Sequence, residues 1–145
     1  MINMFTQYIL KAQSKRGIYC ELGNFLEKKK IISNIWNFIA EVELRDQYGS
    51  TNIGNGVAVP HYQTDQIDTS LVIIGVCHDV IDWPTPDSIP IGVILLFIIN
   101  PHSARNDNFK CLMRNLASKG NLDDLTSVHD KEEFLLRLSE TPNYG

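Results

Sequence analysis

The sequence predicts an α/β fold in which a central β-sheet carries helices on both faces. Two segments, residues 70–77 and 91–99, are almost entirely apolar and rich in β-branched residues, as fully buried strands are. Other segments repeat apolar residues at the three- and four-residue spacing of an amphipathic helix. Strands that are apolar throughout need a cover on both faces, and the helices can supply it.

Two helices are expected in the first part of the chain. The first covers about residues 18–28, and the second covers about 34–44 with Ser33 as its N-cap. The apolar stripe of the first helix consists of Ile18, Leu22, Phe25 and Leu26. The stripe of the second helix consists of Ile35, Phe38, Ile39 and Val42. We expect both stripes to face the sheet.

A tight turn and a short extended segment follow the second helix. Residues 54–56 (Gly-Asn-Gly) can adopt the positive φ angles that tight turns use. Residues 57–59 (Val-Ala-Val) are expected to be extended, because Pro60 disfavours the helical conformation for the residue before it. Proline also cannot donate a hydrogen bond to a sheet ladder. The extended segment therefore stops at Pro60 and His61.

The apolar strands at 70–77 and 91–99 are separated by turn residues. Between them we predict a short strand at residues 80–83, followed by turn chemistry at Thr85-Pro86-Asp87-Ser88. The second apolar strand ends at Asn100-Pro101.

Two further helices are expected near the end of the chain. Apolar residues at i, i+3, i+4 and i+7 predict a helix over about 108–119, with Asn108 as its N-cap and Gly120 as its C-terminal stop. A last helix is expected over about 131–139, where Asp130 is the N-cap. Residues from about 140 to 145 are expected to form a frayed tail.

Composition limits the classes of function. The 145 residues fit one domain, and their formal net charge of -4 argues against a nucleic-acid binder, which needs a basic face. The three cysteines form no C-x-x-C pair, so we expect reduced, mostly buried thiols rather than disulfides or a thiolate metal site. The N-terminal segment lacks the features of a signal peptide, and residues 93–99 are too few to cross a bilayer as a helix. We expect a cytoplasmic protein that does not insert into membranes.

Among the four histidines, His61 has the setting of a functional residue. It follows a turn, a short strand and a proline, so its imidazole stands at the end of a strand on a rigid support. Ends of strands are where α/β sheets place their sites. Histidine titrates near neutral pH, so a neutral ring nitrogen is available there as a nucleophile. His78 and His129 have no such setting, and we expect His129 to be exposed.

The segment around His61 resembles the signature of a known family. Residues 44–61 read LRDQYGSTNIGNGVAVPH. They resemble the enzyme IIA family of the phosphotransferase system, of the fructose/mannitol/nitrogen-regulatory type. That family has an Arg-Glu pair, then Ser-Thr-Gly-Ile-Gly-Asn-Gly, an apolar triplet and Pro-His. Weaker similarity extends over nearly the whole chain.

The resemblance implies a fold, a domain organisation and an activity. The expected fold is a central mixed β-sheet flanked by helices on both faces, as in the α/β sandwich of the mannitol and fructose enzymes IIA. Residues 1–145 would form one such domain. The expected activity is that of a phosphotransferase component without metal or organic cofactor, whose phosphoryl acceptor is His61. The sequence does not identify a sugar.

The resemblance also implies partners. The donor would be the histidine phosphocarrier protein of the phosphotransferase system. The phosphoryl group would pass to an enzyme IIB, or serve as a regulatory signal to a transporter, kinase or transcription regulator. As a short, free-standing domain, the chain is expected to resemble the nitrogen-regulatory members most, and stand-alone sugar-permease components of similar size are the alternative.

Three residues before His61 match the family's motif. Arg45 matches the family's arginine, and a guanidinium group suits phosphate oxygens. The alternative is a surface arginine at a helix end, paired with Asp46. Ser50 and Thr51 could donate hydrogen bonds to the phosphoryl group, Thr51 more so than Ser50, or they could simply build the turn.

The sequence departs from the family at a second active-site histidine. Many members carry it at the start of the helix that follows the strand ending at Pro101. Counting from Pro101 places that position on Asn108, with Phe109 as the close alternative. Asn108 can donate a hydrogen bond to a phosphate oxygen but carries no charge, and it is also a good helix cap. His102, in the same loop, is a further candidate substitute.

Two other readings stay open. The chain could be a non-catalytic regulatory module that keeps the fold for docking to another protein. The missing second histidine and the residues after the motif, Tyr62 and Gln63, favour this reading. The chain could also resemble the cytosolic domain of an anion transporter, although such a domain has no reason to keep the Pro-His signature.

Overall fold

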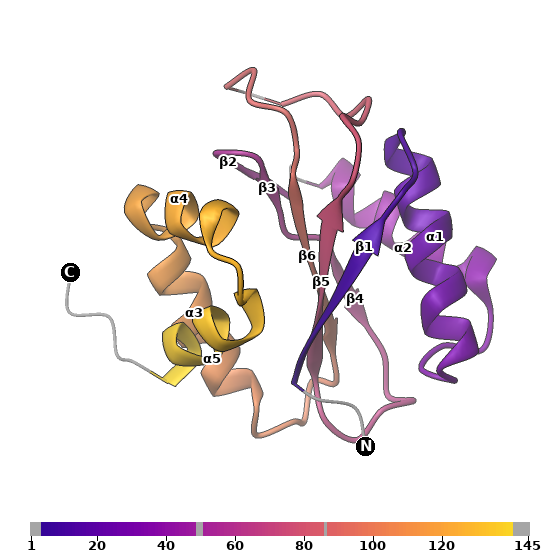
Figure 1. The fold of residues 1–145 in the computed structure, drawn as a ribbon. Helices are drawn as coiled ribbons and strands as arrows, with labels where there is room; N and C mark the ends of the chain where they lie inside the picture. The colour runs from indigo at the N-terminus through magenta and orange to yellow at the C-terminus, as the bar shows by residue number, and fades with distance from the viewer. Residues whose placement is uncertain (1–3, 49–50, 86, 141–145) are drawn as a thin grey trace.

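The computed structural model of the chain describes residues 4–48, 51–85 and 87–140, which form a β-sheet between two layers of helices (Figure 1). The strands are β1 (Phe5–Leu10), β2 (Asn52–Gly54), β3 (Val57–Ala58), β4 (His61–Gln63), β5 (Leu71–Cys77) and β6 (Val93–Ile99). The helices are α1 (Lys15–Lys28), α2 (Ile35–Gln47), α3 (Asn106–Leu116), α4 (Lys119–Ser127) and α5 (Lys131–Glu140).

The sheet is mixed, as the sequence predicted. The strand order is β1-β5-β6-β3-β2, and β4 also pairs with β6. The two long apolar strands, β5 and β6, pair in antiparallel fashion at the centre. β1 runs parallel to β5, and both β3 and β4 run parallel to β6.

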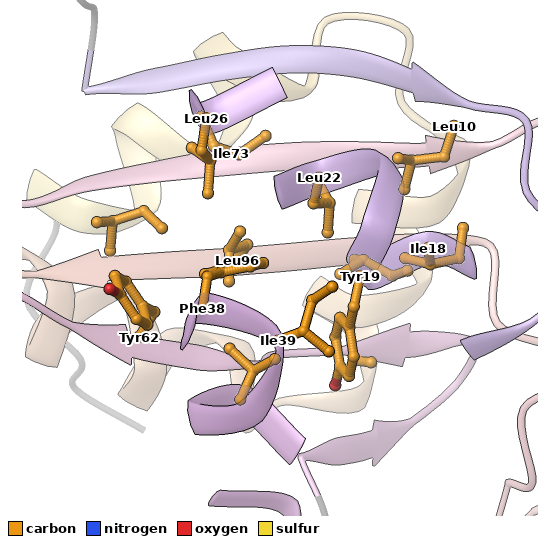
Figure 2. Packing of buried hydrophobic residues seen from close by; sticks show 14 of the residues in the cluster. Leu10, Ile18, Tyr19, Leu22, Leu26, Phe38, Ile39, Tyr62, Ile73 and Leu96 are labelled. Atoms are coloured by element: carbon orange, nitrogen blue, oxygen red, sulfur yellow. The ribbon is translucent and has the colours of Figure 1, made fainter. Parts of the chain in front are cut away.

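The helices cover both faces of the sheet and bury two separate cores. α1 and α2 lie on one face, and α3, α4 and α5 lie on the other (Figure 1). Side chains of a strand alternate between faces, so β6 supplies both cores. It gives Ile94, Leu96 and Ile98 to the core under α1 and α2, and Val93, Leu95 and Phe97 to the core under the other helices. Figure 2 shows the first core, where Leu22 of α1 and Phe38 of α2 pack near Leu96.

One edge of the sheet is interrupted by a proline. Val57 of β3 pairs with Val93 and His61 of β4 pairs with Phe97, so β3 and β4 lie along the same side of β6. Pro60 lies between the two strands, and its carbonyl accepts a hydrogen bond from the Phe97 N–H at 2.9 Å. The predicted stop of the extended segment at Pro60 is therefore correct for β3, while the chain resumes pairing at His61.

The predicted turn before β3 adopts positive φ angles. Gly54, Asn55 and Gly56 have φ of 90°, 55° and 81°. The Gly56 carbonyl then accepts hydrogen bonds from Gly92 and Val93 at 2.8 and 3.1 Å, which joins the turn to the start of β6. The turn thus fixes the register of the edge that leads to His61.

Helix starts differ from the predictions by a few residues. α1 begins at Lys15 rather than Ile18, because the Ser14 side chain caps it by accepting from the Gly17 N–H. The cap of α2 is Asn34 rather than Ser33, and its side chain accepts from two backbone N–H groups. Asp130 accepts from the Glu133 N–H at 3.0 Å, so the predicted cap of α5 is confirmed.

The sequence did not predict the strands β1, β2 and β4 or the helix α4, and it predicted one strand that is not formed. β1 has a half-polar sequence, and its inner residues alternate between exposed and intermediate burial, as an edge strand allows. α4 was missed because Gly120, expected to stop the previous helix, lies inside α4. The strand predicted at 80–83 does not form, and Asp82 contributes an isolated bridge to Ser14. Over the described ranges, no helix combines the length and apolarity needed to cross a bilayer.

The Gly56 turn provides a test of the edge geometry. A Cβ at Gly56 would lie 2.9 Å from the Pro90 carbonyl oxygen. The substituted residue would also have to keep a φ of 81°, which L-amino acids rarely adopt. We expect Gly56→Ala to lower the free energy of unfolding by about 1 to 3 kcal/mol in chemical denaturation. Gly92→Ala is the matched control, because nothing lies within 4 Å of its added Cβ. Equal losses in the two variants would contradict the role of the turn.

Candidate functional site

The β-sheet edge places His61 between the two helix layers. His61 is the first residue of β4, and its ring stacks on that of Phe97, its partner on β6, at 5.1 Å between centroids and 11° between planes. Phe97 is 1% exposed and belongs to the core under α3, α4 and α5. A buried strand pair and a ring stack therefore hold the imidazole in one orientation.

The two ring nitrogens of His61 have different environments. Nδ1 is buried and has no hydrogen-bond partner with good geometry among the described residues. Burial lowers the pKa of the ring, the neighbouring Val59 carbonyl raises it, and the charge of Arg45 lowers it further. The net shift is downward, which favours the neutral form of the ring. A neutral imidazole carries a proton on one ring nitrogen and a free electron pair on the other.

A hollow of about 500 Å³ opens beside His61 on the α2 side. Arg45, in the last turn of α2, lines it together with His61. Leu44 and Tyr48 line it as well, and they are 50% and 82% exposed. The structure thus brings Arg45 and His61 together, as the motif predicted, and surrounds them with exposed apolar side chains.

A second hollow, of about 410 Å³, opens beside His61 on the α3 side. Phe97, Phe109 and Met113 form its apolar lining, while Lys110 and Arg114 bring positive charge. Sequence reasoning missed these two cations. Their i, i+4 spacing on the predicted helix was a usable signal, because it places both on one face. Two residues, His61 and Ile99, line both hollows.

Thr51 is not among the residues that line the two hollows beside His61. It is 5% exposed, and its hydroxyl donates to Asp46 at 3.0 Å. Its carbonyl accepts from the Val59 N–H at 2.7 Å, which ties this segment to the residue before Pro60. In this conformation the hydroxyl binds Asp46, and its contact with a phosphoryl group stays a prediction. Ser50 lies outside the described residues.

Asn108 does not line either hollow beside His61. The prediction that it caps α3 is wrong, because the helix begins at Asn106 and Arg105 occupies the capping position. The Asn108 side chain donates to the Ser139 carbonyl at 3.3 Å, so it faces α5. Asn106, the first residue of α3, lines the hollow on the α3 side together with His61. Its side chain accepts from Ser70 and donates to the Asn100 carbonyl.

The other candidate histidines lie elsewhere. His102 lines a separate polar hollow with residues of α2 and of the loop after β4, and His61 is not among its lining residues. His78 is exposed and pairs with Asp79 at 3.1 Å. Among the residues that the structure describes, no three histidine, cysteine or acidic side chains gather as metal ligands would. The site places one imidazole between a hollow lined by Arg45 and Glu41 and a hollow lined by Lys110 and Arg114, so cationic groups can approach an anionic ligand from both sides.

Comparisons with known proteins agree with this reading of the fold. The sequence model of the family described as phosphoenolpyruvate-dependent sugar phosphotransferase system, EIIA 2, matches residues 4–141. A curated relative, the fructose-specific EIIABC component of the phosphotransferase system from Bacillus subtilis (strain 168), is 23% identical over 105 residues. That match covers 72% of this chain and 16% of the relative, so the chain spans about one sixth of the relative's length.

Solved structures share the fold. The nitrogen regulatory protein IIA-Ntr from Neisseria meningitidis is 20% identical with a TM-score of 0.69, covering 93% of this chain and 92% of that one. IIA mannitol from Escherichia coli is 15% identical with a TM-score of 0.62, covering 94% and 95%. The complex of enzyme IIA and phosphorylated enzyme IIB for mannitol, also from Escherichia coli, contains a chain that is 15% identical with a TM-score of 0.63, covering 92% and 94%.

The lowered pKa of His61 predicts how stability depends on pH. A histidine whose pKa is below its ordinary value of 6.5 in the folded state binds fewer protons folded than unfolded between the two values. Its contribution to stability is therefore complete above the unfolded pKa and is lost as pH falls through the folded pKa. Between about pH 7.5 and about pH 5, wild type should lose more free energy of unfolding than His61→Gln. Parallel losses in denaturant titrations of the two proteins would contradict the buried, neutral ring.

Proposed function

The chain belongs to the phosphoenolpyruvate-dependent sugar phosphotransferase system EIIA 2 family, a family of phosphocarriers, and from this premise we propose that it accepts a phosphoryl group on His61. The observation that carries the proposal is the position of His61 at the sheet edge, where Arg45 lines the hollow on one side, together with Glu41, and Lys110 and Arg114 line the hollow on the other side. Residues 1–145 act as one domain in this proposal, and the protein works in the cytoplasm.

The nucleophile is Nε2 of the neutral His61 ring. Nδ1 is buried, and His61 as a whole is half-buried, so we assign attack on the phosphoryl group to the other ring nitrogen. The bond between Nε2 and phosphorus forms as the bond to the donor's leaving atom breaks, while Nδ1 keeps its proton beside the Val59 carbonyl. A covalent intermediate of this kind splits one transfer into two easier steps.

Positive charges on both sides of His61 stabilise the transferring group. Negative charge is spread over the three equatorial oxygens during phosphoryl transfer, so catalysis is mostly positioning and electrostatics. Arg45 supplies charge from α2, and Lys110 and Arg114 supply it from α3. The two cations on α3 occupy the side on which the family resemblance places a second histidine. They supply positive charge there, and Asn108 is not needed for this role.

The donor and the acceptor are proteins in this proposal. We take the donor to be the histidine phosphocarrier protein and the acceptor to be an enzyme IIB. The solved mannitol complex of an enzyme IIA with phosphorylated enzyme IIB supports the second assignment, because it has the same fold. Exposed Leu44 and Tyr48 beside the ring are suited to an apolar protein surface. A regulatory use of the phosphoryl group is supported by the similarity to IIA-Ntr.

A second candidate function is a docking module without phosphoryl transfer. The observation that favours it is that no second histidine is present among the described residues lining the two hollows beside His61. In that case the exposed apolar side chains near the ring would bind a transporter, kinase or transcription regulator irrespective of phosphorylation.

Phosphorylation of His61 separates the two candidates. Incubation with phosphoenolpyruvate, enzyme I and the histidine phosphocarrier protein should add one acid-labile phosphoryl group to wild type, measured by intact mass. His61→Ala should stay unmodified because it lacks the acceptor nitrogen. Asn108→Ala should be modified like wild type, since its side chain faces α5. An unmodified wild type beside a working control enzyme IIA would refute transfer from this donor.

The rate of the same reaction tests Arg45. A hydrogen bond to a charged group contributes about 1.5 to 3 kcal/mol, so Arg45→Gln should slow phosphorylation by about ten- to a hundredfold. Arg16→Gln is a matched control, because Arg16 is an exposed arginine that pairs with Glu43 away from the ring. Equal rates for wild type and Arg45→Gln, measured by rapid quench, would remove Arg45 from the mechanism.

A further inference from the structure

The carboxylate of Asp46 is held by three different side chains. Its Oδ2 accepts from the Tyr19 hydroxyl at 2.8 Å and pairs with Lys15 Nζ at 2.9 Å. Its Oδ1 accepts from the Thr51 hydroxyl at 3.0 Å. The Asp46 side chain is 12% exposed, against 36% for Lys15, so this is a largely buried acceptor with both oxygens in use.

These contacts join three parts of the chain at one point. Lys15 and Tyr19 belong to α1, Asp46 belongs to the last turn of α2, and Thr51 belongs to the segment that leads to the Gly54–Gly56 turn. Tyr19 is fully buried and packs edge-on against Trp83. Burial and the Asp46 charge raise the pKa of Tyr19 far above its usual range, so its hydroxyl remains a donor.

Arg45 is the residue beside Asp46 in the same helical turn. Its side chain is exposed and long, and the last turn of a helix is the part that frays most easily. Asp46 therefore anchors the helical turn that also carries Arg45, the residue whose charge lowers the pKa of His61. Thr51, through its carbonyl, also fixes Val59 two residues before the ring.

We propose that Asp46 is a positioning residue for Arg45: its contacts with Lys15, Tyr19 and Thr51 fix the last turn of α2 so that the guanidinium group faces the hollow that holds His61. The inference rests on the proposed function in taking Arg45 as the partner of His61. It assigns to Asp46 a task that acts through Arg45 and involves no contact with the phosphoryl group.

The sign of a change at His61 distinguishes positioning from two simpler roles. If Asp46 acted on the ring by its own charge, its removal would lower the pKa of His61, because a negative charge favours the imidazolium. If Asp46 served stability alone, the pKa of His61 would not change. If Asp46 positions Arg45, its removal withdraws a positive charge from the ring and raises the pKa of His61.

The charged groups that face the ring allow this interpretation. Arg45 and Glu41 line the hollow on the α2 side, and Lys110 and Arg114 line the hollow on the α3 side. Asp46 belongs to neither lining, and its three partners hold it on the side of α1. A rise in the pKa of His61 on loss of Asp46 must therefore pass through one of the groups that do face the ring.

The experiment is an NMR titration of the His61 ring in a double-mutant cycle, without any phosphoryl donor. We expect Asp46→Asn to raise the pKa of His61 in the same direction as Arg45→Gln does. The double variant should show no further rise beyond Arg45→Gln alone, because the positioned charge is already absent. An unchanged or lowered pKa in Asp46→Asn, or an additive rise in the double variant, would overturn the proposal.

Matched variants control for the fold. Glu43→Gln removes another ion pair between α1 and α2, the 3.2 Å contact with Arg16, and should leave the pKa of His61 unchanged. If Asp46→Asn does not fold, Tyr19→Phe and Thr51→Val each remove a single anchor, and each should still raise the pKa of His61. No rise in either would overturn the proposal. The titration needs no phosphoryl donor. Its result can therefore be interpreted even if the protein is not phosphorylated on His61.

Discussion

The interruption of the sheet edge at Pro60 is the constraint on which the site depends. β3 and β4 both lie beside β6, but the proline between them cannot donate to the ladder and instead presents its carbonyl to the Phe97 N–H. This contact sets the register that places His61 opposite Phe97. The ring then stacks on a buried phenylalanine and its Nδ1 is enclosed, so the edge strand sets the orientation of the imidazole.

Both helix layers contribute to the surroundings of the His61 ring. The sheet edge is where α2 from one layer and α3 from the other can each approach the same ring, and each brings positive charge. The core under α1 and α2 fixes the first approach, since Phe38 of α2 packs edge to face against Tyr62, the residue after His61, at 5.0 Å between ring centroids. The site thus combines residues of both helix layers at one edge of the sheet, and no single helix or strand supplies all of them.

The parts of the site that are close in sequence could be predicted, and the part that depends on a distant loop could not. Arg45 and His61 belong to one segment, so a local pattern sufficed to place them together. The start of α3 depends on the loop after Pro101, where Ser70, Asn100 and Asn106 bond to one another. Counting residues from Pro101 ignores these contacts and shifted the helix start by two residues.

The same distinction explains the fold. The central strands β5 and β6 are apolar throughout, so their sequence was sufficient. β1 is a half-polar edge strand that forms by pairing with β5, and α4 contains Gly120 and buries only Leu122 and Leu125 among its described residues. Both elements owe their structure to tertiary contacts, and a local pattern does not carry that information.

The central claim is that the buried Nδ1 of His61 leaves Nε2 as the phosphoryl acceptor. NMR of the enzymatically phosphorylated protein, with its histidine rings isotope-labelled, identifies the modified nitrogen directly. The account predicts a phosphoryl group on Nε2 of His61 and a proton retained on Nδ1. A phosphoryl group on Nδ1 of His61, or on a different histidine, would contradict it.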